Sequence, residues 1–230
     1  MAEEFRERNL KGARFVESDL SDVVIRGCEI SGMDIDAPWL PFGKPLTING
    51  VDVVAFVEGE LNRRFPGRAL WRATDLEGLR RAWQAVEDAW DAAIARAATL
   101  SAGAVDERVD GEWSFAETLR HLVHATDLWV SRSVLGWEPG AFHSLGLGYG
   151  LDGGDPAPYD DVLAARAEKV ALVRDLLAGA TTELLEEPRT NPHHAEQPET
   201  VRSCVQVVME ESWEHLRFAL RDLDTIAARR

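Results

Sequence analysis

The 230-residue sequence has few cysteines, a deficit of cationic side chains and no long apolar run. Its two cysteines, Cys28 and Cys204, lie far apart at apolar positions, so we expect reduced thiols in the core rather than a disulfide. Lysine and arginine total 25 against 40 acidic residues, and the net charge of −15 repels nucleic acid and anionic lipid. No segment approaches the ~20 apolar residues that span a bilayer, and no signal-peptide pattern opens the chain. These absences predict a cytoplasmic protein without nucleic-acid or membrane partners.

The motifs of several enzyme classes are missing as well. The sequence contains no P-loop and no Ser-His-Asp pattern. The glycines of GLGYGLDGGD do not form a dinucleotide-binding fingerprint, because no strand precedes them and no helix begins in register after them. Histidine and carboxylate side chains are therefore the main candidates for chemistry.

Large apolar residues recur every five positions near the N-terminus, at Phe5, Leu10, Phe15, Leu20, Ile25, Ile30 and Ile35. Smaller or medium side chains lie two residues before five of them, at Ala13, Ser18, Val23, Cys28 and Met33. This register resembles the pentapeptide-repeat family, whose coils point both sets of residues inward. The segment makes fewer than two such coils and has too little core to stand alone. We expect a small β segment over residues 1–37 with a scaffolding or dimer-forming role; an irregular β-rich arm packed on the main domain is the alternative.

Residues 38–73 are predicted to form a linker that contains one short helix. Regular structure is interrupted there by Pro38, Pro41, Gly43, Pro45 and Gly50. The following segment VDVVAFVEGELNRRF carries mixed signals, and we expect a brief helix with Phe56 and Leu61 turned inward.

Residues 74–230 show the pattern of a four-helix bundle. Apolar residues recur at helical spacing over four long segments, which cover about 74–101, 114–135, 160–177 and 201–230. Ser114 and Glu117 form a capping-box pattern at the start of the second segment. Long connections rich in glycine and proline follow the second and third segments, and such connections cross over a bundle and line its open end. The predicted fold class is mainly α, with long crossover connections in the bundle.

Two polar residues interrupt the apolar stripe of the last helix. The stripe itself is formed by Val201, Cys204, Val208, Ala219 and Ile226. Glu211 and His215 fall on it one helical turn apart, so their side chains point towards the core. Burying a carboxylate and an imidazole costs several kcal/mol unless they have partners. A metal ion or a catalytic hydrogen-bond network is the natural explanation.

His121, on the second helix, is the predicted partner. It lies beside Leu122 at the edge of that helix's apolar face. Facing helices of a bundle can bring His121, Glu211 and His215 within reach of one ion. Two imidazoles and one carboxylate are a typical zinc ligand set that leaves a position for water or substrate. A hydrogen-bonded core histidine is the alternative for His121.

The segments EWSFAETLRHLVHATDLW and EESWEHLRFALRDLD resemble the DinB-like family of four-helix metalloproteins. The resemblance covers roughly residues 74–230 and implies a divalent metal, zinc or else nickel, held by the second and last helices. The family usually has three histidines, whereas Glu211 and His215 form the Glu-x-x-x-His arrangement of the mycothiol-dependent maleylpyruvate isomerase branch. His121 matches the ligand on the second helix.

This resemblance implies a metal-dependent enzyme that uses a low-molecular-weight thiol for S-transfer to a small electrophile or for its isomerisation. A metal stabilises the thiolate form of such a thiol at neutral pH. The alternative is a non-catalytic metal-binding, stress-related or scaffold protein, with a site closed by a fourth ligand such as His124. The bulky tryptophans Trp83, Trp90, Trp129 and Trp213 are expected in the core, and helices of this kind also make a homodimer plausible.

Further residues are weaker candidates for the same site. The side chains that could orient the metal ligands from outside the ligand set are those of Glu210, Glu214 and Asp127. Glutamates at positions such as 210 and 214 are more often solvated helix charges. Arg202, Arg217 and Arg221 could meet an acidic thiol or substrate, with surface ion pairs as the alternative. The loop carrying Trp137, His143 and Tyr149 could close over the end of the bundle.

Overall fold

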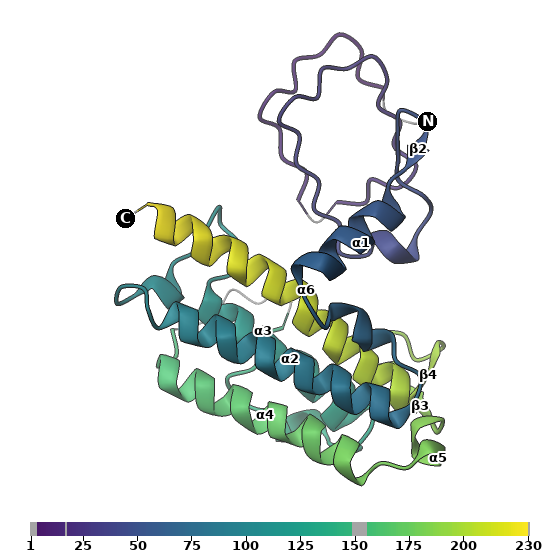
Figure 1. The fold of residues 1–230 in the computed structure, drawn as a ribbon, viewed down its shortest axis with the longest axis vertical. Helices are drawn as coiled ribbons and strands as arrows, with labels where there is room; N and C mark the ends of the chain where they lie inside the picture. The colour runs from purple at the N-terminus through teal and green to yellow at the C-terminus, as the bar shows by residue number, and fades with distance from the viewer. Residues whose placement is uncertain (1–3, 17, 149–155, 230) are drawn as a thin grey trace. The chain divides into compact units, whose positions relative to one another are not determined.

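The computed structural model describes residues 4–16, 18–148 and 156–229. The chain divides into two compact units, Met1–Ala37 and Pro38–Arg230. All six α-helices and both two-stranded sheets of the described residues belong to the second unit (Figure 1). None of the helices in these residues combines the length and apolar character needed to cross a membrane.

The first unit repeats its backbone conformation every five residues. The angle φ is positive at Glu7, Gly12, Asp22, Gly27 and Gly32, and the trace coils into a ring (Figure 1). Backbone hydrogen bonds close alternate corners, from the N–H groups of Ala13, Val23 and Met33 to the carbonyls of Leu10, Leu20 and Ile30. Residues 4–16 and 18–37 contain turns and bends and no strand. The period of five is therefore present in the backbone, without the predicted β pairing.

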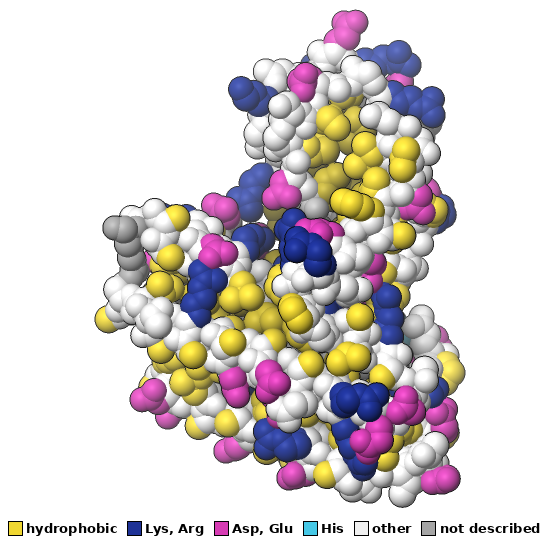
Figure 2. Space-filling view, viewed as in Figure 1, with side chains coloured by type: hydrophobic (Ala, Val, Ile, Leu, Met, Phe, Trp, Pro, Cys, Tyr) yellow, Lys and Arg dark blue, Asp and Glu magenta, His cyan; other side chains and the backbone are white. Residues whose placement is uncertain are grey.

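The side chains of the first unit are exposed wherever the structure describes them. The apolar residues at five-residue spacing were expected to point into a core, yet Leu10 is 48% and Ile30 is 45% exposed. Cys28 is exposed too, so the prediction of a buried thiol there was wrong. A coil of fewer than two turns has no neighbouring turn on either side to cover its inner residues. Figure 2 shows hydrophobic side chains gathered on the drawn face of this ring.

The second unit begins with short elements. The helix η1 (Leu40–Phe42) is followed by an antiparallel hairpin of β1 (Thr47–Ile48) and β2 (Val51–Asp52), by α1 (Val54–Arg64) and by η2 (Arg68–Arg72). The predicted short helix exists as α1, and Leu61 is partly buried. Phe56 is 75% exposed, which contradicts its predicted inward orientation. The reason is that α1 packs mainly against η1 and η2, so it has only a narrow covered face.

Four helices form the bundle: α2 (Leu76–Ala97), α3 (Phe115–Thr126), α4 (Tyr159–Gly179) and α6 (Val201–Ala228). Helices α2 and α3 each contact both α4 and α6 (Figure 1). Side-chain caps fix three of the helix starts. Asp75 accepts a hydrogen bond from Gly78 N, and Ser114 and Thr200 each form a capping box.

The remaining elements connect the bundle helices. They are η3 (Ala104–Asp106), the π-helix η4 (Asp127–Arg132), η5 (Pro139–Ala141), the short α5 (Thr182–Leu185) and the antiparallel strands β3 (Pro188–Thr190) and β4 (Pro198–Thr200). The second predicted helix, 114–135, is thus an α-helix that continues as a π-helix and ends near Arg132.

The bundle core is rich in tryptophan, as predicted. Trp83, Trp90, Trp129 and Trp213 are all buried, with exposed fractions of 8% or less. Trp90 Nε1 donates a hydrogen bond to the Ser212 carbonyl at 3.0 Å, which satisfies its polar atom inside the core. This bond joins α2 to α6 and helps to fix the position of α6 along the bundle axis.

The two cysteines are expected to differ strongly in reactivity. Cys204 is fully buried, and burial raises its pKa to about 12, so little thiolate forms at neutral pH. Cys28 is exposed. At low protein concentration, a chromogenic disulfide reagent should therefore modify one thiol per native chain and two after unfolding. A Cys28→Ser chain should lose the native reaction; rapid modification of Cys204 in that chain would contradict the packing of α6.

Candidate metal centre

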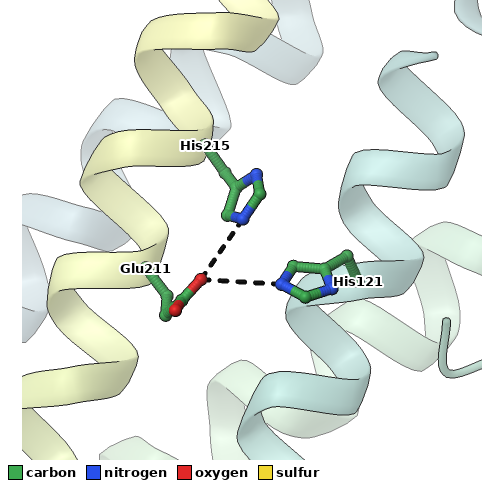
Figure 3. Close-up of side chains that lie close together, drawn as sticks. All are labelled: His121, Glu211 and His215. Carbon is green, nitrogen blue, oxygen red and sulfur yellow. Dashed lines mark ion pairs between the residues drawn. The ribbon is translucent and has the colours of Figure 1, made fainter. Parts of the chain in front are cut away.

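His121, Glu211 and His215 converge between α3 and α6 (Figure 3). One ligand atom from each residue lies within 4.8 Å of the other two. The Nε2 atoms of His121 and His215 lie 3.5 Å and 3.2 Å from the same carboxylate oxygen of Glu211. The three residues predicted from the sequence are thus brought together, with both ring nitrogens directed at one carboxylate.

Helix α6 places two of these side chains by its periodicity. Glu211 and His215 are one turn apart, and the neighbouring Ser212 and Leu216 are buried in the core. The bond from Trp90 to the Ser212 carbonyl holds this turn against α2. The side of the turn that carries Glu211 and His215 faces α3, which contributes His121.

A backbone carbonyl determines the tautomer of His121. The His121 Nδ1 atom lies 3.0 Å from the Leu147 carbonyl oxygen. Because a carbonyl can only accept, Nδ1 carries the hydrogen, and the lone pair of the neutral ring is on Nε2. The lone pair therefore faces the Glu211 carboxylate, and two acceptors at 3.5 Å repel each other unless a proton or a cation lies between them. The donor set fits a metal ion.

The segment that supplies this carbonyl is itself attached to α3. Leu147 N donates to the Arg120 carbonyl at 3.1 Å, and Arg120 Nε donates to the Leu145 carbonyl at 3.0 Å. Residues 145–147 belong to the long connection after the second helix, which was predicted to line the end of the bundle. Their role in orienting His121 is a contact from outside the ligand set, of the kind that tunes metal sites.

The protonation states of the group suit metal ligation. Burial raises the pKa of the Glu211 carboxyl, but the hydrogen bonds that His121 and His215 donate when their rings are protonated outweigh burial and lower that pKa to about 2. Burial lowers the pKa of His215, and the nearby His121 lowers it further, against the opposing effect of Glu211. Ionised carboxylate and neutral imidazole are the forms that bind metals.

Trp113 covers one side of the two imidazoles. Its ring centroid lies 4.7 Å from that of His121 and 6.0 Å from that of His215, with a nearly parallel arrangement to the latter. The two imidazole centroids are 4.6 Å apart. Trp113 was not predicted from the sequence, although its position just before the capping box of α3 places it beside the first turn of that helix. It forms an apolar wall of the site.

His124 does not complete the ligand set. Among the described residues, the group of side chains able to share an ion contains His121, Glu211 and His215, without His124. The His124 ring lies against Phe142, with centroids 6.4 Å apart, and a methyl group built on Gly148 would lie 3.1 Å from its Nε2 atom. The described residues thus bring together three candidate ligands, the number of protein ligands found in catalytic zinc sites.

Asp127 has a structural role. It is fully buried and accepts hydrogen bonds from Lys169 Nζ, from Ser131 Oγ at 2.9 Å and from the His143 backbone N–H at 2.9 Å. The carboxylate therefore joins η4, α4 and the following connection. None of these contacts reaches the three ligand side chains.

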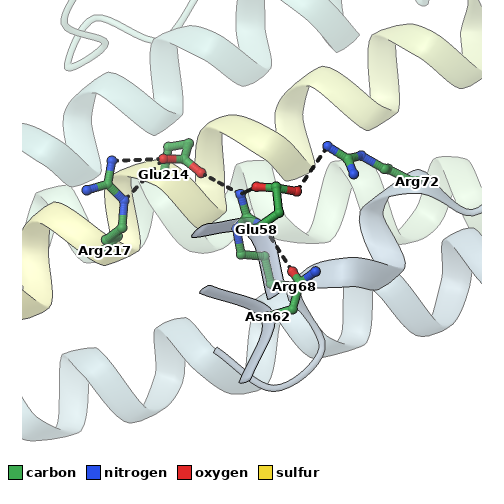
Figure 4. A network of polar contacts seen from close by, with 6 residues as sticks. All are labelled: Glu58, Asn62, Arg68, Arg72, Glu214 and Arg217. Carbon is green, nitrogen blue, oxygen red and sulfur yellow. Dashed lines mark hydrogen bonds and ion pairs between the residues drawn. The ribbon is translucent and has the colours of Figure 1, made fainter. Parts of the chain in front are cut away.

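Glu214 belongs to a buried ion-pair network (Figure 4). Arg68 lies between two carboxylates, donating to Glu58 at 2.9 Å and to Glu214 at 3.1 Å. Arg217 donates to the other oxygen of Glu214 at 3.0 Å. The network fixes η2 and α1 to α6 one turn from Glu211.

Glu210, next to the candidate ligand Glu211, is the third glutamate on this part of α6. Burial, together with the charges of Glu211 and Glu214, raises the pKa of its carboxyl to about 7. Among the described residues, Glu210 is not part of the group of side chains that could share a metal ion.

The three candidate arginines form ion pairs with acidic neighbours. Arg202 contacts Glu186 at 2.7 Å and Arg221 contacts Asp222 at 2.8 Å, while Arg217 belongs to the network above. The Arg202 pair matches the surface ion-pair alternative, whereas Arg221 and Arg217 pair with the buried carboxylates of Asp222 and Glu214. Two residues of the predicted lid make contacts that do not involve the three candidate ligands. The Trp137 ring covers Lys169, whose Nζ atom lies 5.3 Å from the ring centroid. His143 Nδ1 accepts a hydrogen bond from Leu145 N. Tyr149, the third residue of the predicted lid, lies outside the described residues.

The fold and the three side chains define a class of protein: a four-helix bundle with a two-histidine, one-carboxylate group between two of its helices. Residues 85–219 match the DinB superfamily. Because this match spans more than half of the chain, the protein belongs to that superfamily, and the resemblance seen in the sequence is confirmed. No match was found among curated proteins or among solved structures.

Proposed function

We propose that this protein is a metal-dependent enzyme that joins a low-molecular-weight thiol to a small electrophile or isomerises that electrophile through the thiol. The observation that carries the proposal is the convergence of His121, Glu211 and His215 in a protein of the DinB superfamily, whose members in general bind metals. Zinc is the metal that this nitrogen and oxygen donor set suits best, with nickel as the alternative.

The chain's own residues prepare the site for this chemistry. The Leu147 carbonyl holds the His121 lone pair on Nε2, and Glu211 provides the negative charge that attracts a cation. Trp113 packs against both histidines, tilted relative to His121 and stacked on His215, and excludes water from one side. A divalent metal held by these three ligands supplies charge that stabilises a thiolate at neutral pH. A thiolate is the nucleophile that both S-transfer and thiol-assisted isomerisation require.

The proposal includes a location and partners. Low-molecular-weight thiols are kept reduced in the cytoplasm, where we place the protein. Its partners are the thiol, of the mycothiol type, and a small electrophilic substrate. The apolar wall formed by Trp113 favours a substrate with a planar, conjugated carbon skeleton over a strongly polar substrate.

A thiol-consumption assay tests this function. Zinc-loaded full-length protein is mixed with mycothiol and a conjugated carbonyl compound, and loss of thiol and change in the conjugated chromophore are followed separately. Loss of both signals indicates S-transfer, whereas a chromophore change at constant thiol concentration indicates isomerisation. Rates equal to those of a His121→Ala chain, for every thiol and electrophile in a broad panel, would contradict the enzymatic proposal.

Gly146 offers a test of the role of the connection that orients His121. A methyl group at this position would lie 3.2 Å from the His143 carbonyl oxygen and 3.3 Å from His124 Cβ, so Gly146→Ala should push residues 145–147 away from α3. We expect metal affinity to fall about 10-fold, as for loss of other contacts that orient a ligand. Gly140→Ala is the matched control, since nothing lies within 4 Å of its added carbon. Equal zinc affinity in the two chains, measured by competition with a chelator, would contradict this role of Leu147.

A further inference from the structure

Arg166 on α4 is a buried cation without a hydrogen-bond partner among the described residues. The residue is 3% exposed, and its guanidinium atoms Nε, Nη1 and Nη2 are all enclosed and unpaired. A guanidinium carries several N–H donors and no acceptor, and burying such a charged group without a partner is strongly unfavourable. The described part of the chain therefore supplies no counterion for this charge.

The other buried Lys and Arg side chains of the described residues show how this fold neutralises a positive charge. Arg68 lies between two carboxylates, and Lys169 pairs with the fully buried Asp127. Lys169 is on the same helix as Arg166, one turn further along. Buried charges in proteins are normally paired in this way. Arg166 is the exception within the described core.

Glu87 on α2 is the carboxylate whose charge acts on Arg166, and it is already engaged elsewhere. Its Oε1 atom accepts a hydrogen bond from Arg174 Nε at 3.0 Å. The charge of Glu87 raises the pKa of Arg166, but burial has the larger effect and lowers that pKa to about 10. The guanidinium is therefore still protonated at neutral pH. Because Arg174 neutralises Glu87, the charge of Arg166 stays uncompensated where α2 packs on α4.

The surroundings of Arg166 on α4 indicate what kind of partner fits. Val162 and Val173 lie one turn before and two turns after it, and Ala165 is adjacent; all three are buried and apolar. Water can accept hydrogen bonds from a guanidinium but brings no charge. A carboxylate brings a negative charge and two oxygens that match the planar guanidinium. Since the group is enclosed, a small carboxylate fits better than a large one.

We propose that Arg166 is the binding residue for a small carboxylate anion on the inner face of α4. The anion accepts hydrogen bonds from the guanidinium and neutralises the buried charge. None of the three candidate metal ligands takes part, so the site is independent of the proposed enzymatic function. Because the folded chain alone builds this enclosure, binding of the anion stabilises the fold.

Urea unfolding of the full chain in sodium formate tests the proposal. Ionic strength is held constant with sodium gluconate, whose long hydroxylated chain makes its carboxylate too large for an enclosed site. Formate should lower the unfolding equilibrium constant of the wild type along a saturation curve of binding, by roughly 100-fold at roughly 100 times its Kd. An unfolding constant that is the same in formate and in gluconate would overturn the proposal.

Arg166→Met separates this site from other places where formate can bind, the candidate metal centre included. Methionine fills a similar volume without a charge, so this chain should lose the formate dependence. It should also unfold no more readily than the wild type does without formate, because no buried charge remains unpaired. Arg81→Met is the matched control, since it makes the same change at an exposed position of α2 and should keep the full dependence. A formate response of equal size in Arg166→Met would contradict the assignment.

Nuclear magnetic resonance of isotope-labelled formate gives a readout that does not depend on folding stability. At equal protein concentration, the wild type should broaden the formate resonance more than Arg166→Met does, and Arg81→Met should match the wild type. Equal broadening by the wild type and Arg166→Met would overturn the proposal.

Discussion

Replacing Glu211 with glutamine is expected to lower the affinity of the protein for zinc by more than about 100-fold, beyond the 10–100-fold that loss of an outer contact costs. The substitution preserves size and removes the one negative charge of the ligand group. One carboxylate oxygen of Glu211 lies within 3.5 Å of the Nε2 atoms of both His121 and His215. The two other members of the group are histidines, so neither can supply the lost negative charge.

Glu210→Gln is a matched control for this prediction. The two glutamates are adjacent on α6, and Glu210 lies outside the ligand group of the described residues. Its carboxyl is already partly neutral near pH 7, since burial and the charge of Glu211 raise its pKa to about 7. Titration of each protein with zinc against a chromogenic chelator should show a large loss for Glu211→Gln and little for Glu210→Gln. Similar losses in both chains would mean that general negative charge, and not ligation, attracts the ion.

Replacing Arg68 with alanine is expected to lower the free energy of unfolding by about 3–5 kcal/mol. Arg68 is 4% exposed and is held between Glu58 and Glu214. Its removal leaves two poorly solvated carboxylates facing each other without the cation that separates them (Figure 4). Arg72 still pairs with Glu58 and Arg217 with Glu214, so the cost is that of two poorly solvated carboxylates that lose their shared buried cation and keep only one cation each at the edge of the network.

Arg63→Ala provides the comparison for Arg68→Ala. Arg63 pairs with Glu60 at 2.8 Å on the exposed surface of α1, where an ion pair contributes about 0–1 kcal/mol. Urea unfolding, followed by helical circular dichroism, should separate the two variants clearly. If Arg68→Ala were as stable as Arg63→Ala, the network would not anchor η2 to α6. Restoration of stability by Arg68→Met, which refills the volume but carries no charge, would show that lost packing, and not the missing cation, causes the effect.

The four bundle helices could be predicted from the sequence because their signals are local. Apolar residues at helical spacing and side chains such as Asp75 and Ser114 specify where a helix begins and which face it buries. The switch of the second helix to π geometry at Asp127 was not predicted, and Asp127 contacts Lys169 and the His143 backbone there. These partners are distant in sequence.

The candidate ligands could also be predicted, for a different reason. A glutamate and a histidine on an apolar stripe need partners, and a bundle allows few elements to supply them. The tautomer of His121 could not be predicted, since it depends on a carbonyl from residue 147 in an irregular connection. Trp113 and Arg68 were missed for the same reason: their roles depend on how separate elements pack.

In the first unit, the sequence period predicted the backbone repeat correctly and the burial of side chains wrongly. Its five-residue spacing is real in the backbone, as the positive φ angles show. The expectation that Cys28 and the apolar residues are buried failed because burial needs neighbouring coils, which this segment does not provide for itself. A sequence pattern gives the direction of side chains within a coil and leaves open what covers them.

Elemental analysis of full-length protein purified without an affinity tag tests the central claim most directly. Wild type, His121→Ala and His215→Ala should be prepared under matched conditions and examined after dialysis with zinc. The account predicts close to one zinc per chain in wild type and almost none in either variant, with helical content unchanged in all three. A wild-type chain that holds no metal after reconstitution, or variants that retain it fully, would contradict the assignment of these residues as a metal centre.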